Sequence, residues 1–137
     1  MTPLLVVAGA LVGAPLRLLA DRIAVARRGR ATGLGTLTVN VAGSAVLGFV
    51  LGLASAPSWV VALVGTGFCG TLTTFSTFGY DVVRLTGSGH PVLAVGYVLA
   101  SVLGGVCAVV LGLVTARAAI RAADTVDAEL RAGEGTS

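Results

Sequence analysis

The sequence predicts an all-α membrane protein with four transmembrane helices, and three observations support that fold class. Of the 137 residues, 55% are hydrophobic, and the mean hydropathy is +0.98. A soluble domain of this size needs a mostly polar surface, which this composition cannot supply. The apolar residues also gather in four stretches, each able to cross a hydrocarbon core of about 30 Å at about 1.5 Å per residue. The predicted spans are residues 4–20, 34–54, 59–83 and 92–116.

The first span has no Lys or Arg before it. It lacks the basic leader of a secretory signal peptide, so we expect it to stay on the mature protein. Short connections join the spans: a basic loop over residues 21–33, a turn around Pro57, and a Gly/Ser turn over residues 84–91. Residues 1–116 are therefore expected to form one four-span transmembrane domain of a multi-pass protein in the cell inner (plasma) membrane.

Residues 117–137 form a polar C-terminal tail of mixed charge. Ile120, Val126 and Leu130 would give a helix here a weak apolar side. The charged residues between them favour a solvated, partly frayed extension instead.

The Arg residues indicate the topology. With four spans, both termini lie on one side of the membrane, so the basic residues divide into two sets. One side holds six and the other three: Arg17, Arg22, Arg27, Arg28, Arg30 and Arg84 against Arg117, Arg121 and Arg131. The positive-inside rule then favours termini outside. Because these residues flank membrane spans, their expected partner is the lipid bilayer and not nucleic acid.

Residue sets for enzyme chemistry or a side-chain metal site are not apparent. Cys69 and Cys107 lie within predicted spans, without a CxxC pattern or a neighbouring His. A thiol there behaves as a small apolar group. The sequence shows no carboxylate pair, Ser/His/Asp set or phosphate loop, so it predicts a protein that is not an enzyme.

Uncharged polar residues inside the spans point to a polar path. Residues 31–80 contain no Asp, Glu, Lys, Arg or His, yet Asn40 lies within them. Four-residue spacing places side chains on one helix face, and the sequence has three such stripes: Gly9, Gly13 and Arg17; Asn40, Ser44, Gly48 and Gly52; Tyr97, Ser101 and Gly105. The glycines favour close helix packing. Asn40, Tyr97 and Ser101 carry groups that need partners in hydrocarbon, and they favour a polar lining.

The third span contains the unusual run GTLTTFSTF, residues 70–78. Its hydroxyls and β-branched residues are poor material for an uninterrupted helix, so we expect a break near the centre of this span. Unwound carbonyls in a membrane are a recurring cation site. The alternative is an intact helix whose hydroxyls bond back onto its own carbonyls. Phe75 and Phe78, three residues apart, have ring edges of positive quadrupole charge that can face an anion.

Four segments resemble the CrcB/Fluc fluoride channel family, in that family's order and across all four spans. They are GALVGAPLR at 9–17, GTLTVNVAGS at 35–44, GFCGTLTTFSTF at 67–78 and YVLAS at 97–101. The resemblance implies a fluoride-selective channel through which fluoride leaves the cell passively, protecting against fluoride toxicity. It also implies an antiparallel dimer of the same or a related chain, with two pores and a central structural sodium ion.

The resemblance assigns roles to individual residues. Asn40 is implied as a pore amide donor, Phe75 and Phe78 as the pore phenylalanines, and Ser76, Thr77, Tyr97 and Ser101 as members of the polar track. The backbone carbonyls of Gly70 and Thr73 would hold the sodium ion, and Arg17 would lie in the aqueous vestibule. Gly105 departs from the pattern, because some members carry a hydroxyl there. Neutral donors of this kind replace an anion's water without trapping the ion.

Two other classes stay open at this stage. A small multidrug exporter also has four spans, but it needs a carboxylate inside the membrane, and Asp21 and Asp81 are expected only at span ends. A structural membrane protein would use the small-residue stripes for helix packing alone. The six-to-three division of Arg residues further suggests a subunit that inserts mostly one way and pairs with a related chain of opposite bias.

Overall fold

The computed structural model describes residues 2–28, 33–53, 56–73 and 75–134, and the regular structure in these ranges is helical. Four helical stretches are long and apolar enough to cross a membrane, at Thr2–Ala26, Leu34–Gly52, Ser58–Gly87 and Pro91–Ala132. The predicted all-α class with four candidate spans is therefore confirmed. Arg30, Ser55 and Thr74, which belong to predicted loops or to the predicted break, lie outside the described residues.

Helix α1 (Thr2–Arg28) is longer than the predicted span of residues 4–20. The basic loop was expected to begin at residue 21, but the helix continues for two more turns. The residues after position 20 include Ala, Arg and Ile, which favour helix. The end of the apolar stretch marks where the membrane crossing ends, but the helix can continue beyond it. Pro15 lies inside α1, a placement that membrane helices tolerate when neighbours satisfy the freed backbone.

Helix α2 (Leu34–Gly52) begins after Gly33, whose φ of 70° is left-handed. Glycine adopts that conformation without the steric cost that a Cβ imposes. The helix packs mainly against α6 (Pro91–Glu134). A Cβ added to Gly48 would lie 2.1 Å from the Val109 carbonyl oxygen, so glycine permits this close approach of the two backbones.

The third candidate span consists of several pieces. A short helix α3 (Ser58–Val60) continues into the π-helical segment η1 (Val61–Cys69) and then into α4 (Gly70–Leu72). Thr73 then takes an extended conformation, with φ −74° and ψ 149°. Helix α5 (Phe75–Gly87) begins two residues further on. A π-helical stretch of this length is rare and often accompanies a functional site.

The turn between α5 and α6 is tighter than the predicted turn over residues 84–91. Gly89, with φ 79°, donates to the Thr86 carbonyl oxygen, and His90 donates to that of Leu85. This pair of bonds is the Schellman ending of a helix. Pro91 then takes the first position of α6, where its missing N–H is not needed.

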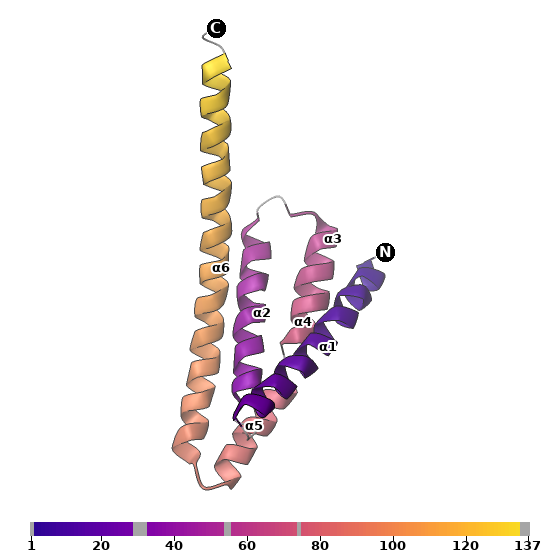
Figure 1. Ribbon diagram of the computed structural model, residues 1–137, viewed down its shortest axis with the longest axis vertical. Helices are drawn as coiled ribbons and strands as arrows, with labels where there is room; N and C mark the ends of the chain where they lie inside the picture. The colour runs from indigo at the N-terminus through magenta and orange to yellow at the C-terminus, as the bar shows by residue number, and fades with distance from the viewer. Residues whose placement is uncertain (1, 29–32, 54–55, 74, 135–137) are drawn as a thin grey trace.

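Helix α6 runs without interruption from Pro91 to Glu134. The partly frayed tail that the sequence favoured is instead a helical continuation, whose residues 121–132 are exposed. The sequence here is rich in Ala with interspersed charged residues, which favours helix. Because the preceding membrane span is already helical, this part only extends an existing helix and needs no new nucleation. Figure 1 shows this part of α6 projecting well beyond the other helices.

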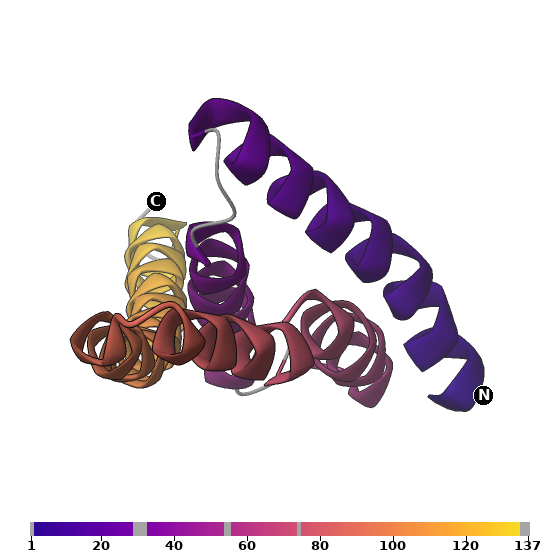
Figure 2. The same cartoon turned by 90° about the horizontal axis from the view of Figure 1, so that it is seen from below.

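The helices lie as a layer crossed by α1. Helix α2 lies beside α6, while α1 slants across the η1 and α4 segments and packs against them (Figures 1 and 2). Large apolar side chains cover the outer surface, among them Leu11 and Leu19 on α1 and Leu103 and Leu111 on α6. Such a surface suits a protein whose solvent is lipid.

Candidate functional site

A groove of about 570 Å³ gathers residues of α2, α4, α5 and α6 around uncharged polar groups. It contains six of the residues that the sequence singles out: Asn40, Gly70, Thr73, Phe75, Phe78 and Ser101. Ser44, one turn after Asn40 on α2, and Gly105, one turn after Ser101 on α6, extend the same lining. The three-dimensional fold therefore joins two stripes whose members, such as Asn40 and Ser101, are 61 residues apart in the sequence.

Three aromatic rings form a row that begins with Phe75 and Phe78 in this groove and continues to Tyr97 behind it. The ring centres of Phe75 and Phe78 lie 5.9 Å apart at an interplanar angle of 42°. Phe78 stacks in turn on Tyr97 of α6, with ring centres 5.5 Å apart. Phe75 is 85% exposed, whereas Tyr97 is buried. Tilted rings present edges as well as faces, so this row offers positive quadrupole charge at the groove.

Ser101 supplies a buried hydroxyl near that of Tyr97, one turn earlier on α6. Its Oγ is buried but has no hydrogen-bond partner of good geometry among the described residues. Buried hydroxyls in native proteins nearly always have a partner, so an exception requires an explanation. Because Ser101 lines the groove, its hydroxyl can serve a group that enters there.

Arg17 joins α1 to α5 at the edge of this region. Its Nη2 donates a hydrogen bond to Thr77 Oγ1, while its Nε is buried without a partner among the described residues. Thr77 lines a second cavity, of about 210 Å³, with Thr36 and Asp81. Ser76 is exposed on α5 and does not line the groove of Asn40 and Ser101.

Asp81 is the candidate site residue that the sequence analysis missed. The sequence places it at a span end, but it is 4% exposed in the interior of α5. It accepts hydrogen bonds from Thr36 Oγ1 at 3.2 Å and from Tyr97 Oη at 3.4 Å. Arg84 Nη2 lies 3.7 Å from its other oxygen. The one available signal was an ionisable residue close to a membrane segment, because such residues are functional candidates; the sequence alone does not show that it is buried.

The start of α2 explains how this carboxylate is stabilised. Gly33, the N-cap of α2, has no side chain to cap the helix, and a Cβ there would lie 3.2 Å from Asp81 Oδ2. The positive end of a helix favours a nearby anion. The Asp81 carboxylate therefore lies near the positive end of α2, and its bonds to Thr36 and Tyr97 link α5 to α2 and α6.

Hydroxyl groups in the 70–78 run partly follow the alternative arrangement in which they bond back onto the helix. Thr71 Oγ1 donates to the Gly67 carbonyl at 2.7 Å, and Thr73 Oγ1 donates to the Cys69 carbonyl at 2.8 Å. Within the described ranges, no three His, Cys, Asp or Glu side chains are grouped as metal ligands.

Comparisons with known proteins identify the family. The family described as CrcB-like protein, Camphor Resistance (CrcB), matches residues 4–113. The fluoride-specific ion channel FluC 1 of Nocardia farcinica is 53% identical over 105 residues, which cover 77% of this chain and 73% of the relative. Relatives of the same name from Frankia casuarinae and Streptomyces avermitilis are 48% and 45% identical, each over 86% of this chain and 98% of their own length. The chain therefore belongs to the CrcB family.

Proposed function

We propose that this protein is a fluoride-selective channel through which fluoride leaves the cell passively, so that it protects the cell against fluoride toxicity. The observation that carries the proposal is the groove in which Asn40, Ser101, Phe75 and Phe78 meet. The relatives named as fluoride-specific channels support the choice of ion. Transport of this kind needs no chemical step, in agreement with the prediction that the protein is not an enzyme.

The groove offers weak, neutral donors to an anion. Fluoride is small and strongly hydrated, so a pore must replace its water with hydrogen bonds. The Asn40 amide and the Ser101 hydroxyl can donate such bonds, and the ring edges of Phe75 and Phe78 add positive quadrupole charge. Ser76, Thr77 and Tyr97 continue the polar track along α5 and α6. None of these groups carries a full charge, which favours passage over trapping.

Arg17 and Asp81 flank this track with the charged groups of the proposed pathway. Arg17 holds Thr77 through its guanidinium and forms part of the aqueous vestibule. Asp81 fixes the Tyr97 hydroxyl and, through it, the ring that stacks on Phe78. The carboxylate thereby positions an aromatic wall of the pathway without standing in the row of neutral donors.

We further propose that the third span is broken at Thr73 and that this break holds a structural sodium ion. A helix that ends at Leu72 leaves the carbonyls of its last turn without the usual partners. The carbonyls of Gly70 and Thr73 would hold the ion, since neutral oxygens at helix breaks are typical sodium ligands. Both residues line the groove, and a Cβ added to Gly70 meets no atom within 4 Å, so the residues fit this role. The ion would supply positive charge that holds the breaks of two subunits together.

A second subunit is needed to complete the pathway. The groove is open along one side, and Phe75 is 85% exposed. Four helices arranged as a layer do not surround a pore by themselves. An antiparallel pairing with the same or a related chain would bring two breaks to one axis and close two grooves.

A flux assay tests the function directly. The purified protein is reconstituted in liposomes loaded with potassium fluoride, a potassium ionophore is added, and fluoride release is followed with an electrode beside a chloride control. The proposal predicts fast fluoride release without chloride release. If folded protein releases no fluoride, coexpression with a related chain tests whether a partner subunit is missing. Continued absence of release would then overturn the channel function.

A further inference from the structure

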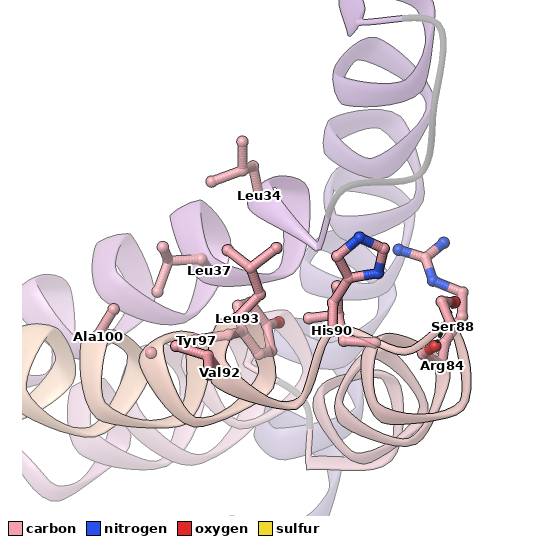
Figure 3. A pocket seen from close by; sticks show the side chains of 11 residues that line it. Leu34, Leu37, Arg84, Ser88, His90, Val92, Leu93, Tyr97 and Ala100 are labelled. Atoms are coloured by element: carbon pink, nitrogen blue, oxygen red, sulfur yellow. Dashed lines mark hydrogen bonds between the residues drawn. The ribbon is translucent and has the colours of Figure 1, made fainter.

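A second groove, separate from that of Asn40 and Ser101, lies between α2, α5 and α6 and has a volume of about 940 Å³. Apolar side chains form most of its wall, including Leu34 and Leu37 of α2 and Leu93 of α6 (Figure 3). Arg84, Ser88 and His90 form its rim at the turn between α5 and α6. We refer to it as the rim groove. Among the residues that line the rim groove, only Tyr97 belongs to the proposed pore.

The rim groove spans the boundary between polar and apolar surroundings. Its polar rim coincides with the end of the candidate span Ser58–Gly87. Ala100, at its other end, lies nine residues into α6, or about 14 Å at 1.5 Å per residue. That depth is about half of a hydrocarbon core of ~30 Å. Figure 3 shows Arg84 and His90 together at one end and Leu37 and Ala100 at the other.

We propose that the rim groove binds one anionic phospholipid, with its phosphate at Arg84 and an acyl chain along Leu34, Leu37 and Leu93. Basic pockets between transmembrane helices at the membrane surface are typical sites for anionic headgroups. The apolar wall accepts any acyl chain, so the cationic rim is the part that selects a negative headgroup.

The charges at the rim support this choice of occupant. The Arg84 side chain is 30% exposed, whereas the side chain of Asp81, its partner in the ion pair, is 6% exposed. Guanidinium presents five N–H donors in a planar fork, so one group can serve a buried carboxylate and a phosphate together. Ser88 and His90 add exposed polar groups beside it. The positive end of α6, which begins at Pro91, faces the same rim.

The inner wall of the rim groove includes Tyr97, the residue that stacks on Phe78 and donates to Asp81. A bound lipid would therefore press on the same ring that borders the proposed pore. This consequence for conduction depends on the proposed function, whereas lipid binding does not. Lipid retention is for that reason the deciding measurement.

Gly96 offers a way to fill the rim groove. It lines the groove, and a Cβ added there meets no atom within 4 Å. Gly96→Leu should therefore occupy the path of the acyl chain without disturbing the fold. Ala14→Leu, at an exposed position of α1, adds similar bulk outside the groove and is the matched control.

The experiment measures retained lipid by native mass spectrometry after reconstitution in vesicles of equal phosphatidylglycerol and phosphatidylcholine. We expect the unmodified protein and Ala14→Leu to retain phosphatidylglycerol preferentially. Gly96→Leu should retain roughly tenfold less, the effect of losing contact with about two methylene groups. Arg84→Lys should keep the preference for phosphatidylglycerol, and Arg84→Gln should lose it.

Three results would overturn the proposal. The first is equal retention of the two lipids by the unmodified protein, which would remove the role of the rim charge. The second is unchanged retention in folded Gly96→Leu. The third is dissociation of an assembled particle in Gly96→Leu but not in Ala14→Leu, which would assign the rim groove to a second subunit. Fluoride flux in the same vesicles reports separately on the channel function.

Discussion

Asp81 illustrates, at the scale of single residues, how a charge is accommodated inside this protein. Its carboxylate has Thr36 and Tyr97 as hydrogen-bond donors and Arg84 as a counter-ion. These groups come from α2, α6 and its own helix. A buried carboxylate without such partners would be strongly unfavourable. The arrangement makes Asp81 both an anchor between helices and the residue that orients Tyr97.

Removing this acceptor should destabilise the protein. In Asp81→Ala the Thr36 and Tyr97 hydroxyls and the Arg84 guanidinium lose their partner, which we expect to lower the free energy of unfolding by about 1–3 kcal/mol. Asp81→Asn keeps a carbonyl oxygen as acceptor and should cost less. Thermal unfolding in detergent measures both variants. Equal stability of Asp81→Ala and the unmodified protein would show that these hydrogen bonds do not contribute to the free energy of unfolding.

Phe78 should determine flux while leaving the assembly intact. Phe78→Ile removes the ring that stacks between Phe75 and Tyr97. We expect fluoride flux to fall about tenfold, which corresponds to the loss of about 1.4 kcal/mol of stabilisation along the pathway. Phe49→Ile, a substitution of a Phe on α2 outside the groove, is the matched control and should leave flux unchanged. Loss of the dimer in Phe78→Ile would instead support the purely structural reading of this ring.

Asn40 should be sensitive to charge and not to size. Asn40→Asp has nearly the same shape but places a negative charge in the groove. Two like charges 4 Å apart repel by about 4 kcal/mol at an effective dielectric constant of 20, so flux should fall at least about a hundredfold. Thr38→Asp, at an exposed position of α2, controls for added charge. Flux is measured in the liposome assay, and near-normal release by Asn40→Asp would remove Asn40 from the pathway.

Sequence reasoning singled out uncharged residues that line the groove, but it did not single out the buried Asp81. Asn40, Ser101 and the two Phe residues are conspicuous because polar or regularly spaced groups inside apolar spans need an explanation. Asp81 is not conspicuous, since a carboxylate near the end of a predicted span ordinarily reaches water. Its burial depends on the N-terminus of α2 folding against α5, a long-range contact that no local pattern contains.

At the scale of elements, close contact between α2 and α6 organises the structure. The approach occurs at glycines of both helices. A Cβ on Gly48 would lie 2.1 Å from the Val109 carbonyl oxygen, and one on Gly112 would lie 2.2 Å from that of Ala45. In lipid, where apolar side chains gain little from contact with each other, such backbone proximity is a main source of helix association.

Gly48→Ala should therefore weaken the pairing of α2 and α6. The added methyl group cannot be accommodated without moving a backbone, and overpacking of this kind costs about 1–3 kcal/mol. Gly96→Ala, on α6 where an added Cβ meets no atom within 4 Å, should be neutral or slightly stabilising, by up to about 1 kcal/mol. Thermal unfolding compares the two variants. Equal effects would show that the contact at Gly48 adapts freely.

The lengths of the helices were harder to predict than their existence. Apolar stretches locate a membrane crossing, and all four are present. Apolar stretches do not locate the ends of α1 and α6. Both helices continue into charged sequence, α1 as far as Arg28 and α6 as far as Glu134. The π-helical segment η1 was also beyond the sequence analysis. Its hydrogen-bond pattern differs from the α pattern by one residue per turn, which apolar composition does not reveal.

At the scale of the whole molecule, charge is distributed unevenly between the two ends of the helical layer. The turn between α5 and α6 and the C-terminal end of α1 lie toward the same end of the molecule (Figure 1). By the sequence count, the first and third connections and the helix ends beside them carry six Arg residues, and the side of the two termini carries three. This asymmetry bears on the proposed dimer, because an antiparallel pair of identical chains needs a subunit that inserts both ways.

The orientation of the subunit is the last prediction. We expect a single orientation, with the terminus of α6 outside, because six Arg residues against three favour retention of the first and third connections inside. A reporter fused to the C-terminus, active on only one side of the membrane, measures this.

Replacing Arg27, Arg28 and Arg30 with Gln leaves three Arg residues on each side and should produce a mixture of orientations. Arg→Lys at the same three positions keeps the positive charges and is the control. It should preserve the single orientation. A reporter that reads half inside and half outside in the unmodified protein would contradict the prediction, and it would favour a dimer of identical chains over pairing with a related chain of opposite bias.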